Sequence, residues 1–128
     1  MKTKTFKVIV AGGRKFNDYP LLKQKLDELF TKVCKTHFIH IVSGTANGAD
    51  KLGEQYAASS FLTIDKYPAD WNKYGKSAGY KRNSLMADNA DALVAFWDGA
   101  SRGTMHMIDL AKSKGLKVRV INYEGETV

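Results

Sequence analysis

The order of the apolar segments in this chain of 128 residues predicts an α/β fold, with a mainly parallel, five-stranded sheet and helices on both of its faces. Short apolar runs alternate with longer segments in which apolar residues recur at helical spacing. Three of the short runs lead directly into a glycine-bearing loop and then into a helix-like segment. In a parallel sheet such loops gather at the carboxyl ends of the strands, where open α/β folds bind ligands. The sequence therefore predicts a single Rossmann-like domain.

The strands are predicted from short runs of apolar and β-branched residues. They cover Phe6–Ala11, Phe38–Val42, Leu62–Asp65, Ala92–Trp97 and Leu116–Asn122. The whole span 1–128 is expected to form one domain, with its core over about residues 6–122. The tail Tyr123–Val128 is expected to fray, because chain ends are seldom tied down.

The helices are predicted from capping residues and apolar periodicity. Asn17 or Asp18 caps the first helix, and Pro20 lies in its first turn. Further helices are expected at about Ala49–Ser60, Tyr80–Asn89 and Thr104–Lys114. The segment Pro68–Gly79 is expected to be an irregular loop, and a loop of this length in a small domain is commonly functional.

The composition is ordinary for a globular protein, with 44% hydrophobic and 26% charged residues. No apolar run is long enough to span a bilayer, and the single cysteine, Cys34, fits a reducing compartment. A cytoplasmic location without membrane contact is therefore expected. The formal net charge of +7 attracts polyanions and keeps nucleic acid open as a partner. The alternative is that the lysines only solvate helix faces and strand ends.

The three glycine-bearing loops share the features of an anion site. They are Ala11–Arg14, Ser43–Asp50 and Asp98–Thr104. Glycine lets the backbone approach a ligand closely, and the helix that follows offers unpaired N–H groups and a positive dipole end. Together the loops predict a phosphate-bearing small molecule as the ligand.

Several common site types are missing from the sequence. Gly44 and Gly48 form G-x-x-x-G instead of G-x-G-x-x-G, so NAD-dependent hydride transfer is not predicted. The segment Gly75-Lys76-Ser77 lacks the first glycine of a P-loop and follows no strand. The three histidines lack metal-ligand spacing. Neither a metal nor a cofactor is expected.

The chain combines five short motifs, each of low specificity by itself. They are Gly12-Gly13-Arg14, Ser43-Gly44-x-Ala46-x-Gly48-Ala49-Asp50, Pro68-Ala69-Asp70-Trp71, Arg82-Asn83 and Asp98-Gly99-x-Ser101-x-Gly103-Thr104. The combination resembles the YspA-like branch of the SLOG superfamily, which also contains the Lonely Guy phosphoribohydrolases and the DNA-processing protein A. The resemblance runs from about Phe6 to Ile121 and implies binding of nucleotides or nucleotide-derived ligands. For some members it also implies a part in nucleotide signalling and in conflict with phages.

The resemblance places ligand-binding residues in all five motifs. The predicted set is Gly12, Gly13, Arg14, Ser43, Gly44, Thr45, Ala46, Gly48, Ala49, Asp50, Asp70, Trp71, Arg82, Asn83, Asp98, Gly99, Ser101, Arg102, Gly103 and Thr104. The arginines would clamp phosphate, and the two aspartates Asp50 and Asp98 suit ribose hydroxyls or a base edge. Trp71 with Tyr74 and Tyr80 would form a stacking wall. Structural alternatives stand beside these roles, such as a tight turn at Gly12-Gly13 or a surface ion pair at Arg82.

Catalysis is harder to predict. The Lonely Guy enzymes carry a glutamate in the pattern P-G-G-x-G-T-x-x-E, and Met107 occupies its position here. A thioether can neither take up a proton nor stabilise a developing positive charge. The catalytic residues are therefore unknown, with Arg82, Asp98 and Glu54 as candidates.

Three functions follow from these observations. The leading one is a sensor or sequestering protein that binds a phosphorylated nucleotide derivative, such as an ADP-ribose-like compound or a cyclic nucleotide, in nucleotide signalling or phage–host conflict. The first alternative is a nucleotide N-glycosidic or phosphoribosyl hydrolase of the Lonely Guy type. The second is single-stranded nucleic-acid binding through four basic residues that are interleaved with aromatic ones, Lys73, Lys76, Lys81 and Arg82. The resemblance also implies a homo-oligomer, a dimer or higher.

Overall fold

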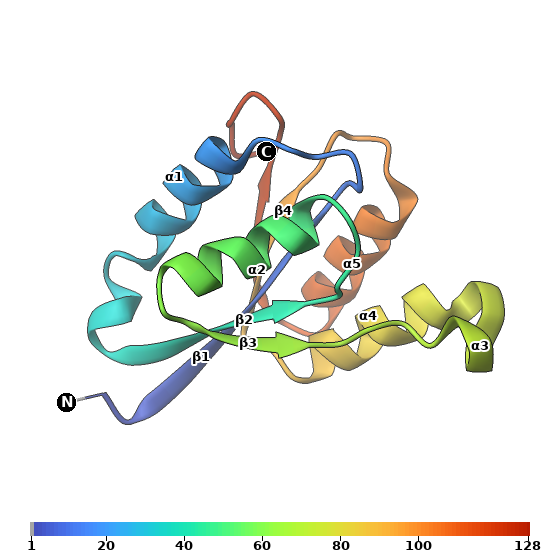
Figure 1. The fold of residues 1–128 in the computed structure, drawn as a ribbon, viewed down its shortest axis with the longest axis horizontal. Coiled ribbons are helices and arrows are strands. Elements are labelled where there is room, and N and C mark those ends of the chain that lie inside the picture. The colour runs from blue at the N-terminus through green and yellow to red at the C-terminus, as the bar shows by residue number, and fades with distance from the viewer. Residues whose placement is uncertain (1) are drawn as a thin grey trace.

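The computed structural model describes residues 2–128 (Figure 1). One sheet has the strand order β3-β2-β1-β4-β5, and every neighbouring pair is parallel. The strands are β1 (Lys4–Gly12), β2 (His37–Ser43), β3 (Thr63–Lys66), β4 (Ala92–Phe96) and β5 (Lys117–Ile121). The α-helices are α1 (Tyr19–Phe30), α2 (Ala49–Ser59), α3 (Trp71–Tyr74), α4 (Ala78–Asp88) and α5 (Arg102–Ser113), with short 3₁₀ turns η1 (Val33–Lys35) and η2 (Gly75–Ser77). The predicted fold class is confirmed.

The strand order creates a switch point at the centre of the sheet. The chain leaves β1 for β2 and β3 on one side, then crosses to β4 and β5 on the other side. The connections that follow β1 and β4 therefore diverge from adjacent strands. Open α/β sheets bind their ligands in the crevice that this divergence leaves at the carboxyl ends.

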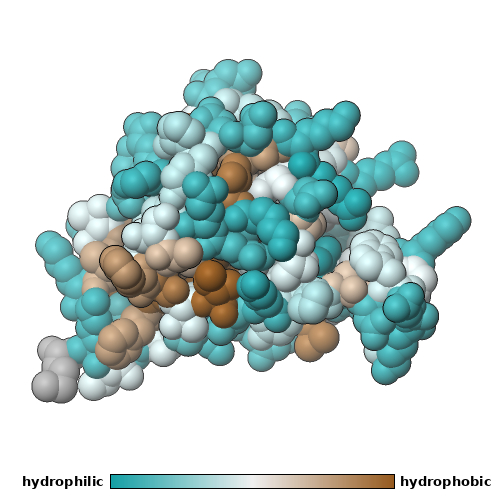
Figure 2. All heavy atoms as spheres, viewed as in Figure 1, coloured by the Kyte–Doolittle hydropathy of each residue, from teal (hydrophilic) through white to brown (hydrophobic). Residues whose placement is uncertain are grey.

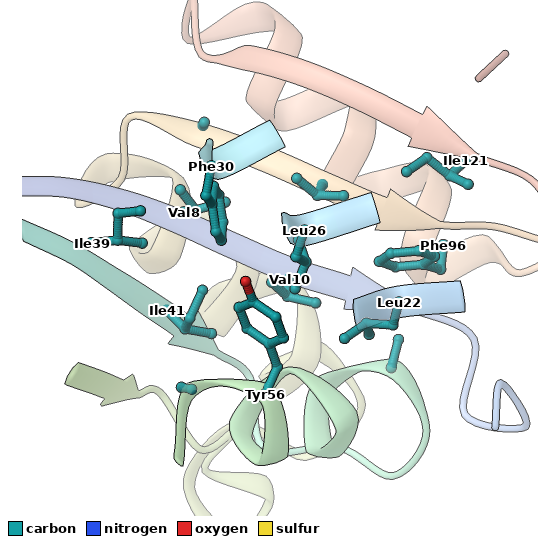
Figure 3. Close-up of a cluster of buried hydrophobic side chains, with 14 of the residues drawn as sticks. Val8, Val10, Leu22, Leu26, Phe30, Ile39, Ile41, Tyr56, Phe96 and Ile121 are labelled. Carbon is teal, nitrogen blue, oxygen red and sulfur yellow. The ribbon is translucent and has the colours of Figure 1, made fainter. Parts of the chain in front are cut away.

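Helices cover both faces of the sheet because successive residues of β1 point to opposite sides. Val8 and Val10 join a buried cluster with Leu22 and Leu26 of α1 and Tyr56 of α2 (Figure 3). Ile9 and Ala11 join a second buried cluster, formed with Met86 and Ala87 of α4 and Met107, Ile108 and Ala111 of α5. Burial of these two apolar layers supplies the main driving force for folding.

The predicted loop Pro68–Gly79 is wrong in part, because local capping orders this segment. The Asp70 side chain accepts a hydrogen bond from the backbone N–H of Lys73 at 3.1 Å and starts α3. Gly75, at φ +57°, then turns the chain into η2 and α4, which begins at Ala78 instead of Tyr80. Figure 1 shows this segment projecting at the end of the molecule opposite the N-terminus.

The predicted fraying of the tail is also wrong. The N–H of Val128 donates to the carbonyl of Val120 at 2.8 Å, and Ile121 forms an antiparallel bridge with Thr127. The ring of Tyr123 packs against Phe16 with centroids 5.0 Å apart. The tail is therefore folded back over the end of β5 and joins the body of the protein.

The face of the molecule seen in Figure 2 is mostly hydrophilic, in keeping with the net charge of +7. Among residues 2–128, no helix is both long enough and apolar enough to cross a membrane.

Candidate functional site

A cavity of about 650 Å³ lies at the carboxyl ends of β1 and β4, which is the switch point of the sheet. Its volume is within the usual range of ligand pockets, roughly 300–1,000 Å³. It is lined by Ala11, Gly12, Gly13, Arg14, Lys15, Ala46, Asp50, Trp71, Lys76, Gly79, Tyr80, Arg82, Asn83, Met86, Asp98, Ser101, Gly103, Thr104, Met107 and Tyr123. Four basic and two acidic side chains are among them, so the cavity favours an anion.

The loop after β1 needs its glycines because other elements approach it closely. A Cβ atom on Gly12 would collide with the carbonyl oxygen of Phe96 and lie 2.8 Å from the Cβ of Ala49. A Cβ atom on Gly13 would collide with the hydroxyl of Tyr123. The two glycines thus let β1, α2, β4 and the folded tail meet at one wall of the cavity.

The loop after β2 does not offer its groups to the cavity in the way that the sequence predicts. Ser43 is fully buried, and its hydroxyl donates to Glu54 Oε2 at 2.7 Å and accepts from the N–H of Thr45 at 3.0 Å. Gly48 has φ +83°, and the N–H of Ala49 donates to the carbonyl of Gly13 at 3.3 Å. The first turn of α2 therefore packs against the β1 loop, and only Ala46 and Asp50 of the segment Ser43–Asp50 line the cavity.

Asp50 is the buried acid of the site. Its Oδ2 accepts the N–H of Ala46 at 3.2 Å, and the residue is only 6% exposed although it reaches the cavity wall. Burial raises the pKa of this carboxyl to about 6, while the Ala46 hydrogen bond and the charges of Arg82 and Arg14 act against the rise. Asp50 therefore changes its charge near neutral pH.

Two hydrogen-bond acceptors, one from the backbone and one from a side chain, hold the Arg82 guanidinium beside the loop that leads to Asp50. Its Nη1 donates to the carbonyl of Gly44, and its Nε donates to Asn83 Oδ1 at 2.9 Å. Burial lowers the pKa of the guanidinium, which stays charged. Among residues 2–128, no carboxylate lies within 4.0 Å of its nitrogens. A half-buried arginine without an ion-pair partner is available to an anionic ligand.

The loop after β4 presents the open end of α5 to the cavity. Asp98 Oδ1 accepts the N–H groups of Ala100 and Ser101, both at 2.8 Å, and these bonds lower the pKa of Asp98. Ser101 caps the helix by accepting the N–H of Thr104 at 3.5 Å. Within the described chain, the N–H groups of Arg102 and Gly103 donate to no backbone or side-chain oxygen. These two N–H groups can bind an anion with the help of the helix dipole.

Aromatic residues form part of the opposite wall. Trp71 and Tyr80 line the cavity, and both are about half exposed. Tyr74 does not line it: its ring lies under the amines of Lys73 and Lys81, which are 5.1 and 4.9 Å from its centroid. Of the three aromatic residues predicted to stack on a ligand, Trp71 and Tyr80 therefore line the cavity and Tyr74 does not.

A smaller cavity of about 260 Å³ adjoins the first and shares four of its residues, Arg14, Ala46, Trp71 and Arg82. Its remaining lining comes from Gly44, Thr45, Asn47, Pro68 and Ala69. These groups are uncharged. The two arginines therefore stand at the junction between a larger cavity and a smaller one.

Most predicted site residues line one of the two cavities, but several lie elsewhere. Neither cavity is lined by Ser43, Gly48, Ala49, Glu54, Asp70, Gly99 or Arg102. The reasons are local: Ser43 and Glu54 bond each other, and Asp70 caps α3. Among the catalytic candidates, Arg82 and Asp98 are at the cavity and Glu54 is not.

Sequence reasoning missed other members of the cavity. Tyr123 was predicted to lie in a frayed tail, and Lys76 was considered only for nucleic-acid binding. Met86 and Met107 carry only a helical apolar pattern, which gives no sign that they reach a ligand site. Met107 is 1% exposed and lines the cavity, where it offers no acid or base. No cluster of three or more histidine, cysteine or acidic side chains able to hold a metal occurs in the described part of the chain.

Comparison with known proteins agrees with this architecture. The chain is similar to the X-ray structure of TM1055, a structural genomics target, with a TM-score of 0.62 and 20% identity over 91% of this chain and 72% of that one. It is 32% identical over 119 residues to the Gene 61 protein of Mycobacterium phage D29, covering 88% of this chain and 93% of the phage protein. The model of the YspA, cpYpsA-related SLOG family matches residues 6–74. With these matches, and with its glycine loops gathered at the switch point of a parallel sheet, the chain belongs to the YspA-related SLOG family.

Proposed function

We propose that this protein binds a phosphorylated nucleotide, or a compound derived from one, in the cavity at the switch point. The observation that carries the proposal is that Arg82, which forms no ion pair with a carboxylate of residues 2–128, lines the same cavity as the N-terminal turn of α5. A guanidinium fork and a helix N-terminus are two of the commonest phosphate ligands in proteins. Trp71 and Tyr80 supply faces on which a base can stack.

The smaller cavity favours a ligand that is longer than a mononucleotide. Its own lining residues are uncharged, with the Thr45 hydroxyl and the Asn47 amide as hydrogen-bonding groups, while Arg14 and Arg82 stand at the junction. A phosphate or diphosphate between the arginines would place a nucleoside in the larger cavity and a sugar in the smaller one. An ADP-ribose-like compound has this form, and a compact cyclic mononucleotide does not.

The binding site suits a sensor or a sequestering protein better than a hydrolase. Met107 stands at the cavity where the resemblance to the Lonely Guy enzymes calls for a glutamate. We therefore infer a role in nucleotide signalling, in the cytoplasm, where such ligands are found. The similarity to a phage protein is consistent with a part in phage–host conflict.

The proposal is tested first by native mass spectrometry of the purified protein with a panel of AMP, ADP, ADP-ribose, cyclic AMP and cyclic dinucleotides. Affinity is then measured by calorimetry for the best ligand. Arg82→Ala is expected to weaken binding at least tenfold, because a charge-assisted pair to phosphate is lost. Arg119→Ala is the matched control, since Arg119 is exposed on β5 and lines neither cavity. Equal affinity of the Arg82 variant and the control would contradict the proposed site.

A second variant tests the smaller cavity by itself. Ala69 lines only that cavity, so Ala69→Phe is expected to fill it. We expect weaker binding of ADP-ribose and unchanged binding of AMP. If both ligands were affected alike, the ligand would not extend into the smaller cavity. If no member of the panel bound to the unmodified protein, the proposed function itself would fail.

A further inference from the structure

His106 contacts Asn83, the residue that follows the proposed phosphate arginine, and does not line the cavity itself. Its Nδ1 lies 3.2 Å from the Nδ2 of Asn83, and its ring meets the Tyr80 ring edge-on with centroids 4.4 Å apart. Asn83 is 7% exposed and follows Arg82 in α4. A buried amide of this kind must have its hydrogen bonds satisfied from the surrounding protein.

The partners of Asn83 select one orientation of its amide. Nδ2 donates to the carbonyl of Gly103 at 3.5 Å and faces His106 Nδ1, while Oδ1 accepts from Arg82 Nε at 2.9 Å. The reverse orientation would set the amide N–H groups against the N–H of Arg82 and the amide oxygen against the Gly103 carbonyl. The observed orientation requires His106 Nδ1 to act as an acceptor, which is possible only in the neutral imidazole.

Arg82 is thus fixed along two edges by groups that do not belong to the ligand. Gly44 holds Nη1 and Asn83 holds Nε, and the Arg82 side chain forms no other hydrogen bond within residues 2–128. Since the Asn83 amide is itself fixed by His106, the three side chains form a directed chain of hydrogen bonds. We propose that His106, acting through Asn83, positions the Arg82 guanidinium for the ligand, and that Arg82 loses this support when His106 takes up a proton. The proposal rests on the proposed function only for the identity of the ligand.

The mechanism follows from the hydrogen-bonding capacity of each group. A protonated His106 carries N–H on both ring nitrogens and needs an acceptor where Asn83 now presents a donor. Asn83 can meet that need only by turning its oxygen toward His106, which removes the acceptor from Arg82 Nε and directs amide N–H groups at a cation. The groups facing His106 are Tyr80 and Asn83 from α4 and Asp109 from its own helix. Partial burial lowers the pKa of His106, and Asp109 opposes this effect, so the neutral form prevails at pH 7.5.

Two substitutions at this position separate the acceptor from the titration. In His106→Asn the amide oxygen takes the place of Nδ1 and accepts at every pH, whereas His106→Phe keeps a ring against Tyr80 and accepts at none. The probe is ADP-ribose, whose diphosphate does not titrate between pH 5 and 8. We expect the unmodified protein to bind as tightly as His106→Asn at pH 7.5, and about tenfold more weakly than it at a pH where NMR shows the His106 imidazole to be protonated. His106→Phe is expected to be the weak binder at both values.

The deciding quantity is the ratio of the dissociation constant of the unmodified protein to that of His106→Asn. The titration of Asp50 affects both proteins alike, so its effect cancels in this ratio. A ratio that stays constant across the pH range in which NMR shows His106 to titrate would overturn the proposal. A second readout needs no ligand: in ¹⁵N-labelled protein the Nε–H resonance of Arg82 should shift as His106 titrates and should not shift in His106→Asn. If ADP-ribose failed to bind at pH 7.5, the proposed ligand would be wrong, and this resonance would still decide on His106. An Arg82 Nε–H chemical shift that does not change as His106 titrates would overturn the proposal.

Discussion

At the scale of single residues, the site contains two oppositely charged groups, Asp50 and Arg82, that lie near each other without forming an ion pair. Asp50 and Arg82 both border Gly44: a Cβ atom there would lie 2.8 Å from Asp50 Oδ2 and 2.7 Å from Arg82 Nη1. Yet the carboxylate bonds the N–H of Ala46, and the guanidinium bonds the carbonyl of Gly44. Each charge is therefore fixed by the backbone, and the guanidinium remains available to an anion.

The burial of Asp50 should appear as a pH dependence of stability. Its pKa is raised from 3.8 to about 6 in the folded protein, so between these values the folded state binds more protons than the unfolded state. The free energy of unfolding should therefore fall as the pH rises through this range, by about 3 kcal/mol from this group. In Asp50→Asn the amide oxygen still accepts from Ala46 and the contribution disappears. Between pH 4 and pH 7.5, urea unfolding should show the unmodified protein losing about 2 kcal/mol of stability relative to Asp50→Asn. Parallel pH profiles of the two proteins would contradict this assignment.

At the scale of elements, the first turns of α2 and α5 both border the cavity, and each has one N–H group satisfied by a nearby loop residue. In the first turn of α2, the N–H of Ala49 donates to the carbonyl of Gly13 at 3.3 Å. The first turn of α5 is capped by Ser101 and leaves the N–H groups of Arg102 and Gly103 without an acceptor in residues 2–128. The short helix α3 and the folded tail then bring Trp71 and Tyr123 to the walls.

The cap of α5 should matter for both stability and binding. Ser101→Ala removes the side-chain acceptor at the helix N-terminus and is expected to cost about 1 kcal/mol of unfolding free energy. It should also weaken nucleotide binding, because the first turn of α5 would fray beside the ligand. Ser113→Ala, at the far end of the same helix, is the control: its exposed hydroxyl bonds only the carbonyl of Leu110. Urea unfolding and calorimetry on both variants check the expectation, which fails if Ser101→Ala behaves like Ser113→Ala.

At the scale of the whole molecule, the parallel sheet brings the cavity together from segments that are far apart in the chain. Arg14, Asp50, Arg82 and Thr104 follow different strands, and Tyr123 comes from the end of the chain. The helices α4 and α5, which pack against each other, expose Tyr80, Leu85 and Met105 to solvent. Such exposed apolar side chains are one route to self-association.

We propose that the protein forms a homo-oligomer through the exposed surface of α4 and α5. Leu85 is 54% exposed, and Leu85→Lys is expected to shift the protein toward the monomer in size-exclusion chromatography with light scattering. Phe61→Lys is the control, since Phe61 is 96% exposed on the connection before β3. A monomer at every concentration of the unmodified protein would remove this proposal. An equal effect of both variants would contradict the choice of surface.

The fold was largely predictable because its signals are local. The apolar runs that form β1, β2 and β4 are each followed by a glycine loop and then by a segment with helical periodicity. Each of these features is visible within a dozen residues. The strand ends differ from the predicted ones by a residue or two: β1 and β2 extend past their apolar runs, whereas β4 and β5 are shorter than predicted. The short helix α3 was not predicted because four residues are too few to show a helical apolar periodicity. Its cap, Asp70, was noticed only as part of a sequence motif.

The sequence by itself determined the fold class, the sheet edge that holds the site and the residue types that favour an anion, because these follow from periodicity and from the fixed direction of parallel strands. Only the tertiary structure decided which of those residues face the cavity. The Ser43 hydroxyl bonds Glu54, the N–H of Ala49 bonds the carbonyl of Gly13, and His106 bonds the buried amide of Asn83. These outcomes depend on hydrogen-bond partners distant in the chain, so no local pattern could reveal them.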